Sequence, residues 1–543
     1  MEHLIIISIV ITAVFLIVSG LIKGITGITA NAVLIIGWFF LNKNEGWFTH
    51  KQFSITLVCS VIPYLLIYLV FLRKKQIKEE QEGGAPIASA KTQKRKNASF
   101  NEYKRIPLKS GLEIKDVFAG VYVGGAAGSG KTRAIIVKIL TKHFAKYSFA
   151  GIIYAYKNYE LCRYLVSQFG RENCDIFAPN APNVTVKINP LNPAYFNDET
   201  EIKSFFQEML QNVTRGKKND ATSDFFNNAA VGLATGLTWI IKNRAPQYCT
   251  LPHIAALCLM NSRDNLCALL RSDVRAEMQA SNYLNATGDA LGSLNGTIAN
   301  FFGAFSTPAI FYSLYDKNGK YVDLKVNYPE NPRQLFLVND IANEKVILPV
   351  INSVLYLSLS LLAKGDKYRS YTLIDEGSTI NLEGFSRKPA TLRSLENATV
   401  FAIQDLVLAV EQSNENTPRA IIANLSTQYF GKVNDPKTAK MYENIVETIE
   451  EKKRSYTSSS GKTDSSSTTV SKQNRKKFRA DEFFRLKAGE FVTFTDGKSK
   501  KVFYDYKSGI DEAKITPVRD VSQWELNKNY EEILEWGKTY ILL

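Results

Sequence analysis

Residues 125–132 form the motif whose residue types and spacing most clearly indicate chemistry. This motif is a glycine-rich loop that ends in Lys131-Thr132. The apolar run Val121 to Val123 precedes this loop, and a helix-like segment from Arg133 to Phe144 follows it. A phosphate-binding P-loop requires this order of strand, loop and helix. Glycines let backbone N–H groups turn toward a triphosphate, and the helix N-terminus adds favourable partial charge. The pattern therefore predicts nucleotide binding by Gly125, Ala126, Ala127, Gly128, Ser129, Gly130, Lys131 and Thr132.

The last two residues of the loop have separate expected roles. Lys131 would reach the β- and γ-phosphates of ATP, and Thr132 would hold Mg²⁺. A tight turn that only needs glycine is the alternative interpretation, but it leaves Lys-Thr at this spacing unexplained.

A pair of acids, Asp375-Glu376, follows the strand-forming run Tyr371 to Ile374. At the carboxyl end of a buried strand, Asp375 is placed to bind the Mg²⁺ shell. Glu376 is placed to polarise the attacking water as a general base. Unpaired buried carboxylates are costly, so a buried strand that ends in two acids indicates a use. A surface strand end with two solvated acids is the alternative.

Two more side chains complete the predicted catalytic set. Gln404 ends the next strand, Thr399 to Ile403, and its amide would lie near the γ-phosphate as a sensor. Arg393 lies between the acids and Gln404 and could act as an arginine finger on a neighbouring subunit's nucleotide. Arg387 competes for that role, and a solvated or ion-paired helical arginine stays open as the simpler interpretation of Arg393.

The surrounding pattern is α/β. Short apolar runs predict strands that are buried on both faces of a parallel sheet, at residues 117–123, 151–156, 334–338, 371–374 and 399–403. Residues between about 200 and 310 have helical patterns instead. The sequence therefore predicts a nucleotide-binding domain from segments 106–199 and 321–543, interrupted by an all-α domain at 200–320.

The C-terminal part has two local signals. Residues 455–474 are rich in serine and threonine and low in apolar content, which predicts a mobile loop. Residues 490–494 and 501–506 flank Asp496-Gly497 and predict a hairpin.

The first 72 residues predict a membrane anchor of two or three spans. Residues 4–22 and 54–72 are apolar, and each would form ~28 Å of helix, which matches a hydrocarbon core of about 30 Å. Residues 25–41 are a possible third span. A signal peptide is the alternative for residues 4–22, but Met-Glu-His supplies no basic start. Basic residues after position 72 place that end of the last span in the cytoplasm.

The net charge and the cysteine pattern indicate the kind of partner and the cellular compartment that suit this protein. The net charge of +15 over 543 residues indicates an acidic partner such as nucleic acid or anionic lipid. The predicted linker 73–105 carries ten Lys/Arg against four Asp/Glu, which fits either such a contact or a solvated tether. The six cysteines form no Cys-x-x-Cys pair, which argues against a structural zinc site and suits a reducing cytoplasm.

Together these residues resemble the type IV coupling proteins, membrane-anchored ATPases of conjugative DNA transfer. The resemblance covers most of residues 110–510 and the anchor. It also includes Ile188-Asn-Pro-Leu191, Asp224 to Ile241, Ile422 to Phe430 and Asn434-Asp-Pro436. One segment departs from the family, because Tyr154-Ala-Tyr-Lys-Asn158 stands where an Asp-Pro-Lys-Gly-type segment is usual, and only Lys157 fits.

The resemblance implies a fold, an assembly and a transport activity. The fold would be a RecA-like P-loop ATPase core with an inserted all-α domain and N-terminal transmembrane helices. Six subunits would form a ring in the bacterial inner membrane, with the ATPase domain in the cytoplasm. ATP hydrolysis with Mg²⁺ would move plasmid or single-stranded DNA and its relaxase toward a type IV secretion channel. Two other functions stay open: an ATPase that exports proteins through a related channel, and a nucleotide-switched membrane receptor that docks substrates without pumping.

Overall fold

The computed structural model describes residues 99–107, 112–214, 221–288, 290–364, 368–380, 384–404, 406–412, 416–459, 465–507 and 511–542. The predicted spans and most of the predicted linker lie outside the described residues. From residue 99 the chain is folded: helix α5 (Phe100–Lys104) begins after Ser99, whose backbone N–H donates to the Glu102 carboxylate at 3.0 Å. Tyr103 of this helix is buried in the core, so the end of the predicted linker belongs to the folded domain.

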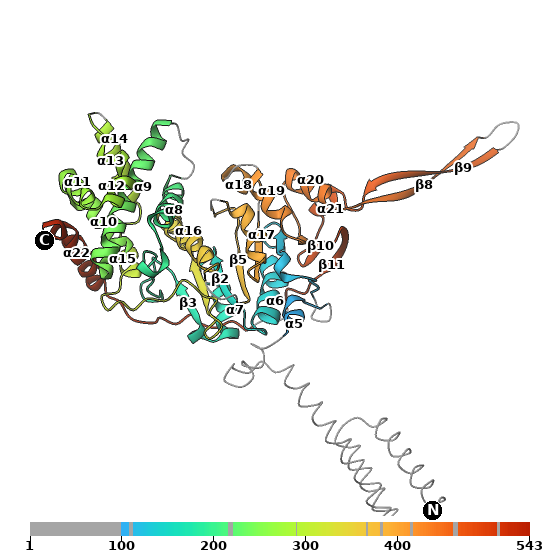
Figure 1. Ribbon diagram of the computed structural model, residues 1–543. Coiled ribbons are helices and arrows are strands. Elements are labelled where there is room, and N and C mark those ends of the chain that lie inside the picture. Colours follow the sequence, from blue (N-terminus) through green and yellow to red (C-terminus); the bar gives the residue numbers. More distant parts are fainter. Residues whose placement is uncertain are drawn as a thin grey trace, which may run out of the picture. The chain divides into compact units, whose positions relative to one another are not determined.

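A nine-stranded sheet lies at the centre of the described residues (Figure 1), in the order β11-β10-β7-β1-β6-β5-β2-β4-β3. Seven strands, from β7 to β3 in this order, are parallel, and the β10–β11 hairpin adds to β7 in antiparallel fashion. The strands are β1 (Val121–Gly124), β2 (Ala150–Ala155), β3 (Cys174–Phe177), β4 (Gln334–Val338), β5 (Ser370–Ile374), β6 (Asn397–Ile403), β7 (Thr427–Phe430), β10 (Glu490–Thr495) and β11 (Lys498–Phe503).

The start of β1 differs from the sequence prediction. Val117–Ala119 form a short 3₁₀ turn (η2), because the Asp116 carboxylate accepts a hydrogen bond from the Phe118 N–H at 3.0 Å. Gly120 then reverses the chain with a φ of 79°, a conformation that favours glycine. The strand proper therefore begins at Val121.

The parallel strands are buried on both faces, as the continuous apolar runs predicted. Alternate residues enter two separate cores: Tyr154 lies in one, and its neighbour Ile153 lies in the other. The second core also takes apolar residues of the helix after the P-loop (η3 Lys131–Ile136, α6 Val137–Ile139, η4 Leu140–Phe144) and of α7 (Glu160–Phe169). The first core continues into the helical region.

Residues 199–314 form that helical region: α8 (Glu199–Val213), α9 (Ala221–Arg244), α10 (Leu251–Met260), α11 (Arg263–Arg271), α12 (Val274–Gln279), α13 (Ser281–Leu284), α14 (Ala290–Gly303) and α15 (Pro308–Leu314). Helix α16 (Glu344–Leu361) packs against α8 and against β2 and β4. It is long and apolar enough to cross a membrane, but it is mostly buried and serves as a core helix between the sheet and the helical region.

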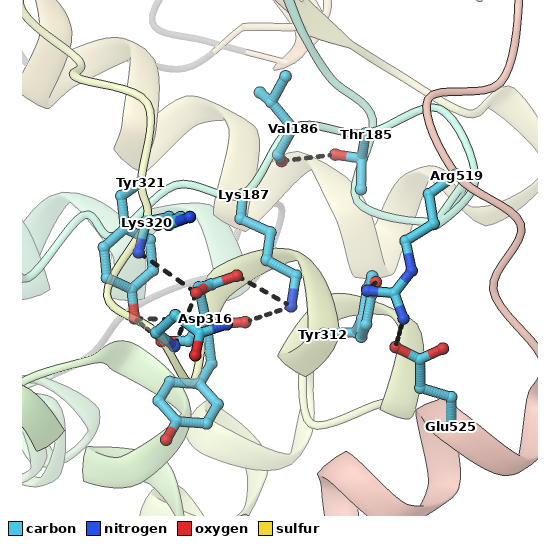
Figure 2. A network of polar contacts seen from close by, with 11 residues as sticks. Thr185, Val186, Lys187, Tyr312, Asp316, Lys320, Tyr321, Arg519 and Glu525 are labelled. Carbon is cyan, nitrogen blue, oxygen red and sulfur yellow. Dashed lines mark hydrogen bonds and ion pairs between the residues drawn. The ribbon is translucent and has the colours of Figure 1, made fainter.

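Two segments of the chain, which contain Ile188 and Val322, join the helical region to the sheet domain. Ile188 and Val322 form a parallel bridge where the chain enters and leaves the helical region. Beside them, the Lys187 ammonium donates to the Tyr315 carbonyl at 2.9 Å and lies 3.9 Å from the centre of the Tyr312 ring (Figure 2). These contacts line a cleft of about 400 Å³ at the junction.

The C-terminal segment passes along both parts. The Glu512 carboxylate pairs with Arg133, in the helix after the P-loop, at 2.9 Å. Farther on, the Val518 N–H donates to the Asn183 carbonyl at 2.8 Å, and Arg519 pairs with Glu525 at 2.6 Å (Figure 2). Helix α22 (Gln523–Thr539) then packs against α10 and α15, although the sequence assigned residues 321–543 to the nucleotide-binding domain.

The prediction of a mobile loop at residues 455–474 is wrong for most of that segment. Strands β8 (Thr448–Ser459) and β9 (Ser465–Lys476) form a two-stranded antiparallel ribbon. This ribbon has no apolar face on a core, so its sequence lacks the alternation that marks a half-buried strand. Glu447 fixes the base, since its carboxylate binds Lys477 at 2.8 Å and the Ser499 hydroxyl at 2.5 Å.

Candidate active site

The P-loop lies between β1 and the helix that begins at Lys131, as the sequence predicted. Gly125, Gly128 and Gly130 have φ values of 152°, 76° and 91°, which are strained for other residues. At Gly125 a Cβ would also meet the backbone of Gly431 at 3.2 Å. The glycines are therefore needed for the shape of the loop. The helix that follows is largely of the π type, with a short α-helical segment at Val137–Ile139.

Neighbouring strand ends hold the loop by backbone hydrogen bonds. The Gly125 N–H donates to Ile403, at the end of β6, at 3.2 Å. The Ala126 N–H donates to Lys432, just after β7, at 2.6 Å, and the Gly489 N–H donates to Ser129 at 2.9 Å. The loop is thus fixed to three separate parts of the sheet domain, and this fits a preformed phosphate site.

Lys131 is buried, with 7% of its surface exposed. Its ammonium donates to the Gly125 carbonyl, within its own loop. Burial lowers the pKa of Lys131 to about 8, although the negative charges of Glu376 and Asp375 oppose this shift. Strand β6 lies between β1 and β5, and its end bonds both the P-loop, through the Gly125 N–H, and Glu376, through the Gln404 N–H, so Lys131 and the two acids lie at the same edge of the sheet, the nucleotide edge.

Asp375 and Glu376 follow β5 directly and are 7% and 4% exposed. Burial raises the pKa of Asp375 to about 7, while the nearby Lys157 ammonium works in the opposite direction. A carboxyl group that is buried at this cost is suited to a cation that compensates its charge. Gly377 comes next, and a Cβ there would meet the Phe401 ring at 2.3 Å, so glycine leaves room for that ring beside the acid pair.

The Glu376 carboxylate is positioned by hydrogen bonds. Its Oε1 accepts from the Ser378 hydroxyl at 2.6 Å and from the Gln404 backbone N–H at 3.2 Å. Strand β6 lies between β5 and β1, so Gln404 lies beside the acid pair, at the edge that also carries the P-loop. This adjacency agrees with the position the sequence predicted for Gln404, whose role as a sensor stays a prediction.

Arg393 lies elsewhere. It ends helix α17 (Lys388–Arg393) and pairs with Asp116 at 3.0 Å, near the amino ends of β1 and β6. This is the edge of the sheet opposite Lys131. Arg393 is 55% exposed, and Arg387, at the start of the same helix, is exposed too. Because Arg393 is held at this opposite edge by Asp116, a finger role for it would require a neighbouring subunit.

The loop fits a magnesium nucleotide. The Ser129 hydroxyl is buried without a hydrogen-bond partner, and a buried polar group in that state calls for a ligand. No atom lies within 4 Å of the position that a Cβ on Gly128 would take, so the loop is open there. The Lys131 ammonium, the half-buried Thr132 hydroxyl and the Asp375 carboxylate supply the cation and oxygen groups that phosphates and Mg²⁺ bind.

The sequence reading missed other polar groups at this edge. Asn339 follows β4, is 1% exposed, and both polar atoms of its amide lack partners. Its backbone N–H donates to Ala155, at the end of β2, at 3.0 Å. Glu160, in α7, is close enough to influence the pKa of Asp375. Asn339 carried a usable signal, because it is a polar residue directly after a buried strand, as Asp375 and Gln404 are.

Comparisons with known proteins agree with this architecture. Residues 369–488 match the family described as the TraM recognition site of TraD and TraG. The sequence matches none of the curated proteins. The fold is similar to the bacterial conjugative coupling protein TrwB in its unbound monoclinic form, with a TM-score of 0.60 and 14% identity over 80% of this chain and 98% of that one.

Two nucleotide complexes of the same coupling protein match as well. The complex with the non-hydrolysable GTP analogue GDPNP has a TM-score of 0.59 at 14% identity, covering 80% of this chain and 99% of that one. The complex with ADP and Mg²⁺ has a TM-score of 0.58 at 15% identity, with the same coverage. The predicted α/β fold is therefore confirmed for the described residues and is shared with this coupling protein, whereas the predicted membrane spans lie outside the described residues.

Proposed function

We infer that this chain, a member of the type IV coupling protein family, is an ATPase that drives conjugative DNA transfer. The observation that carries this proposal is that the P-loop with Lys131 and the acid pair Asp375-Glu376 lie at the same edge of the sheet, both bonded to the end of β6. A binding module that never hydrolyses nucleotide has no need for a second buried acid that is oriented by two hydrogen bonds.

Each group at this edge has a distinct part in the proposed reaction. Lys131 and the P-loop N–H groups hold the phosphates, and Thr132 and Asp375 would hold Mg²⁺. When bound, Mg²⁺ supplies positive charge to the phosphate oxygens. Glu376 orients the attacking water and takes its proton, and Ser378 and the Gln404 N–H hold its carboxylate in place. Arg393 of one subunit would stabilise the charge that develops in the site of the next.

Glu376→Gln tests the catalytic proposal. Glutamine keeps the size and can still accept a hydrogen bond from Ser378, but it cannot act as a base. We expect nucleotide binding near the wild-type level, measured with a fluorescent ATP analogue, and steady-state hydrolysis slower by roughly 10²-fold or more. A wild-type rate of phosphate release would remove Glu376 from the mechanism.

DNA as the transported substrate needs its own test. We expect single-stranded DNA to stimulate hydrolysis and to bind the full-length protein in detergent. A dedicated exporter of proteins would show neither effect, although its catalytic edge would be the same. The Glu376→Gln protein serves as the control, because it should still bind DNA while its ATPase activity stays low.

The remaining parts of the proposal concern assembly. The anchor would cross the bacterial inner membrane two or three times and leave the ATPase domain in the cytoplasm. Six copies would form a ring below the secretion channel, and residues of the helical region would receive the relaxase complex. The match of residues 369–488 to a TraM recognition site supports an interaction with a conjugation complex.

A further inference from the structure

The β8–β9 ribbon contains a basic face that the catalytic proposal does not use. Strands β8 and β9 pair over twelve positions, from Thr448 opposite Lys476 to Ser459 opposite Ser465. The ribbon extends away from the nine-stranded sheet (Figure 1). Isolated two-stranded ribbons are marginally stable in water, so a binding partner would stabilise this one.

The register decides which side chains share a face. Alternate residues point to the same side, and directly opposite residues do so as well. Lys452 lies opposite Lys472, Arg454 opposite Val470, and Tyr456 opposite Thr468. At these three positions one face combines three cations with two exposed apolar groups: Tyr456 is 74% exposed and Val470 is 53% exposed. Nearer the base, Glu450 and Lys476 share this face.

The charges on this face are incompletely neutralised. Lys472 pairs with Glu450 at 2.9 Å, while the described residues offer no ion pair to Lys452 or Arg454. Two lysines directly opposite each other destabilise a ribbon, and an anion bound across both would relieve the repulsion. Over the whole segment 448–476, seven Lys/Arg stand against three Asp/Glu.

We propose that this face of the ribbon binds the phosphate backbone of the transported DNA, with Tyr456 stacking on a base. The inference rests on the proposed function and adds a site to it. Lysines and arginines that follow a backbone, with an aromatic ring between them, are typical of surfaces that bind single strands without reading sequence. A protein partner that adds a strand to the edge fits less well, because charged side chains discourage such pairing.

The test uses full-length protein in detergent and a fluorescent single-stranded oligonucleotide, titrated at several salt concentrations. Lys452→Ala/Arg454→Ala should weaken binding on the order of tenfold at low salt. It should also reduce the slope of log affinity against log salt by about 1.4, at ~0.7 for each lost phosphate contact. Tyr456→Ala should weaken binding several-fold without changing the slope, because stacking releases no counterions. Lys317→Ala/Lys538→Ala is the matched control, since it removes the same charge at exposed positions in another region and should change neither quantity.

A deletion variant separates loss of DNA binding from loss of folding. Replacing residues 450–474 by Asn-Gly joins Ile449 to Arg475, which face each other in the register, and keeps the base at Glu447. We expect an unchanged melting temperature and loss of most DNA affinity. Wild-type affinity and salt slope in this variant would overturn the ribbon site while leaving the proposed function intact. DNA binding that persists while conjugative transfer is lost would also overturn it, in favour of a protein partner. No DNA binding by the wild-type protein would refute both proposals.

Discussion

The nucleotide edge of the sheet and the β8–β9 ribbon hold their charged residues in opposite ways. At the edge, Lys131, Asp375 and Glu376 are nearly inaccessible, and burial shifts the pKa values of the first two. On the ribbon, Tyr456 and Lys472 are mostly exposed, and the backbone ladder supplies most of the order. Precise chemistry on a small group needs fixed, desolvated charges, whereas a long polymer can be bound by exposed ones.

The largest expected effect is on ATP hydrolysis, and it tests whether the nucleotide edge and the ribbon act independently. Lys131→Ala should reduce ATP hydrolysis by at least ~10³-fold, because it removes a cation from the phosphates in both the bound and transition states. DNA affinity without nucleotide should stay at the wild-type level if the ribbon supplies it. Rates of phosphate release and the titration described for the ribbon measure the two properties. Equal loss of both would show that the two regions are not independent.

Arg393→Ala tests a third position, which is exposed like the ribbon residues but is proposed to act in hydrolysis. We expect a loss of roughly 10³-fold in hydrolysis if the arginine serves a neighbouring subunit. The ion pair with Asp116 is exposed and worth at most about 1 kcal/mol, so the melting temperature should barely change. Arg387→Ala is the matched variant, because it removes an exposed arginine from the same helix.

Mixed oligomers decide how Arg393 acts. Subunits with Lys131→Ala should regain activity when combined with Arg393→Ala subunits, because some interfaces then carry an intact lysine and an intact arginine. Absence of recovery in a well-assembled mixture would leave Arg393 with a structural role.

A smaller effect is expected at the base of the ribbon. Burial by itself raises the pKa of Glu447, but hydrogen bonds from Lys477 and Ser499 outweigh it and lower the pKa to about 2. Because this value is below the ordinary value of 4.5, the stabilisation is complete above pH 4.5 and is lost as pH falls toward 2.

Glu447→Gln should therefore cost about 1–2 kcal/mol in the free energy of unfolding at pH 7. The difference from wild type should shrink as the pH is lowered below about 4.5. Urea unfolding at pH 7 and at pH 3.5 measures it, and Glu450→Gln, on the exposed part of the ribbon, is the control. A difference that is constant with pH would mean that the charge of Glu447 contributes nothing.

The sequence predicts the nucleotide edge well because several independent constraints act on each residue there. Gly125 has a positive φ, Lys131 follows the glycine-rich loop at the start of a helix, and Asp375 directly follows a buried strand. Strand β4 was predicted at its observed bounds, since five apolar or amide residues stand between turn signals. Strand β3 was missing from the predicted set, and β7 was indicated only by the resemblance of Ile422 to Phe430 to a strand of the family.

The ribbon shows where such reasoning stops. Ser466 to Thr469 would suit a solvated loop equally well, and only the pairing with β8 makes them a strand. The position of Arg393 is similar, since the sequence gives its distance from Glu376 along the chain but not the edge of the sheet that it occupies. Long-range pairing and the course of the chain decide both cases.

The C-terminal segment connects the helix after the P-loop to the helical region, and its length limits how far these two parts can separate. Its Glu512 pairs with Arg133, one residue after Thr132 of the P-loop, and α22 begins at Gln523 on the helical region. The eleven residue steps between these points span at most about 35–40 Å when fully stretched. Within this span the Val518 N–H is also bonded to the Asn183 carbonyl, so only the five steps from Val518 to Gln523 lie between that anchor and α22. A separation of α22 from Asn183 by more than about 16–18 Å would therefore break the Val518 hydrogen bond before it pulled on the Arg133–Glu512 pair.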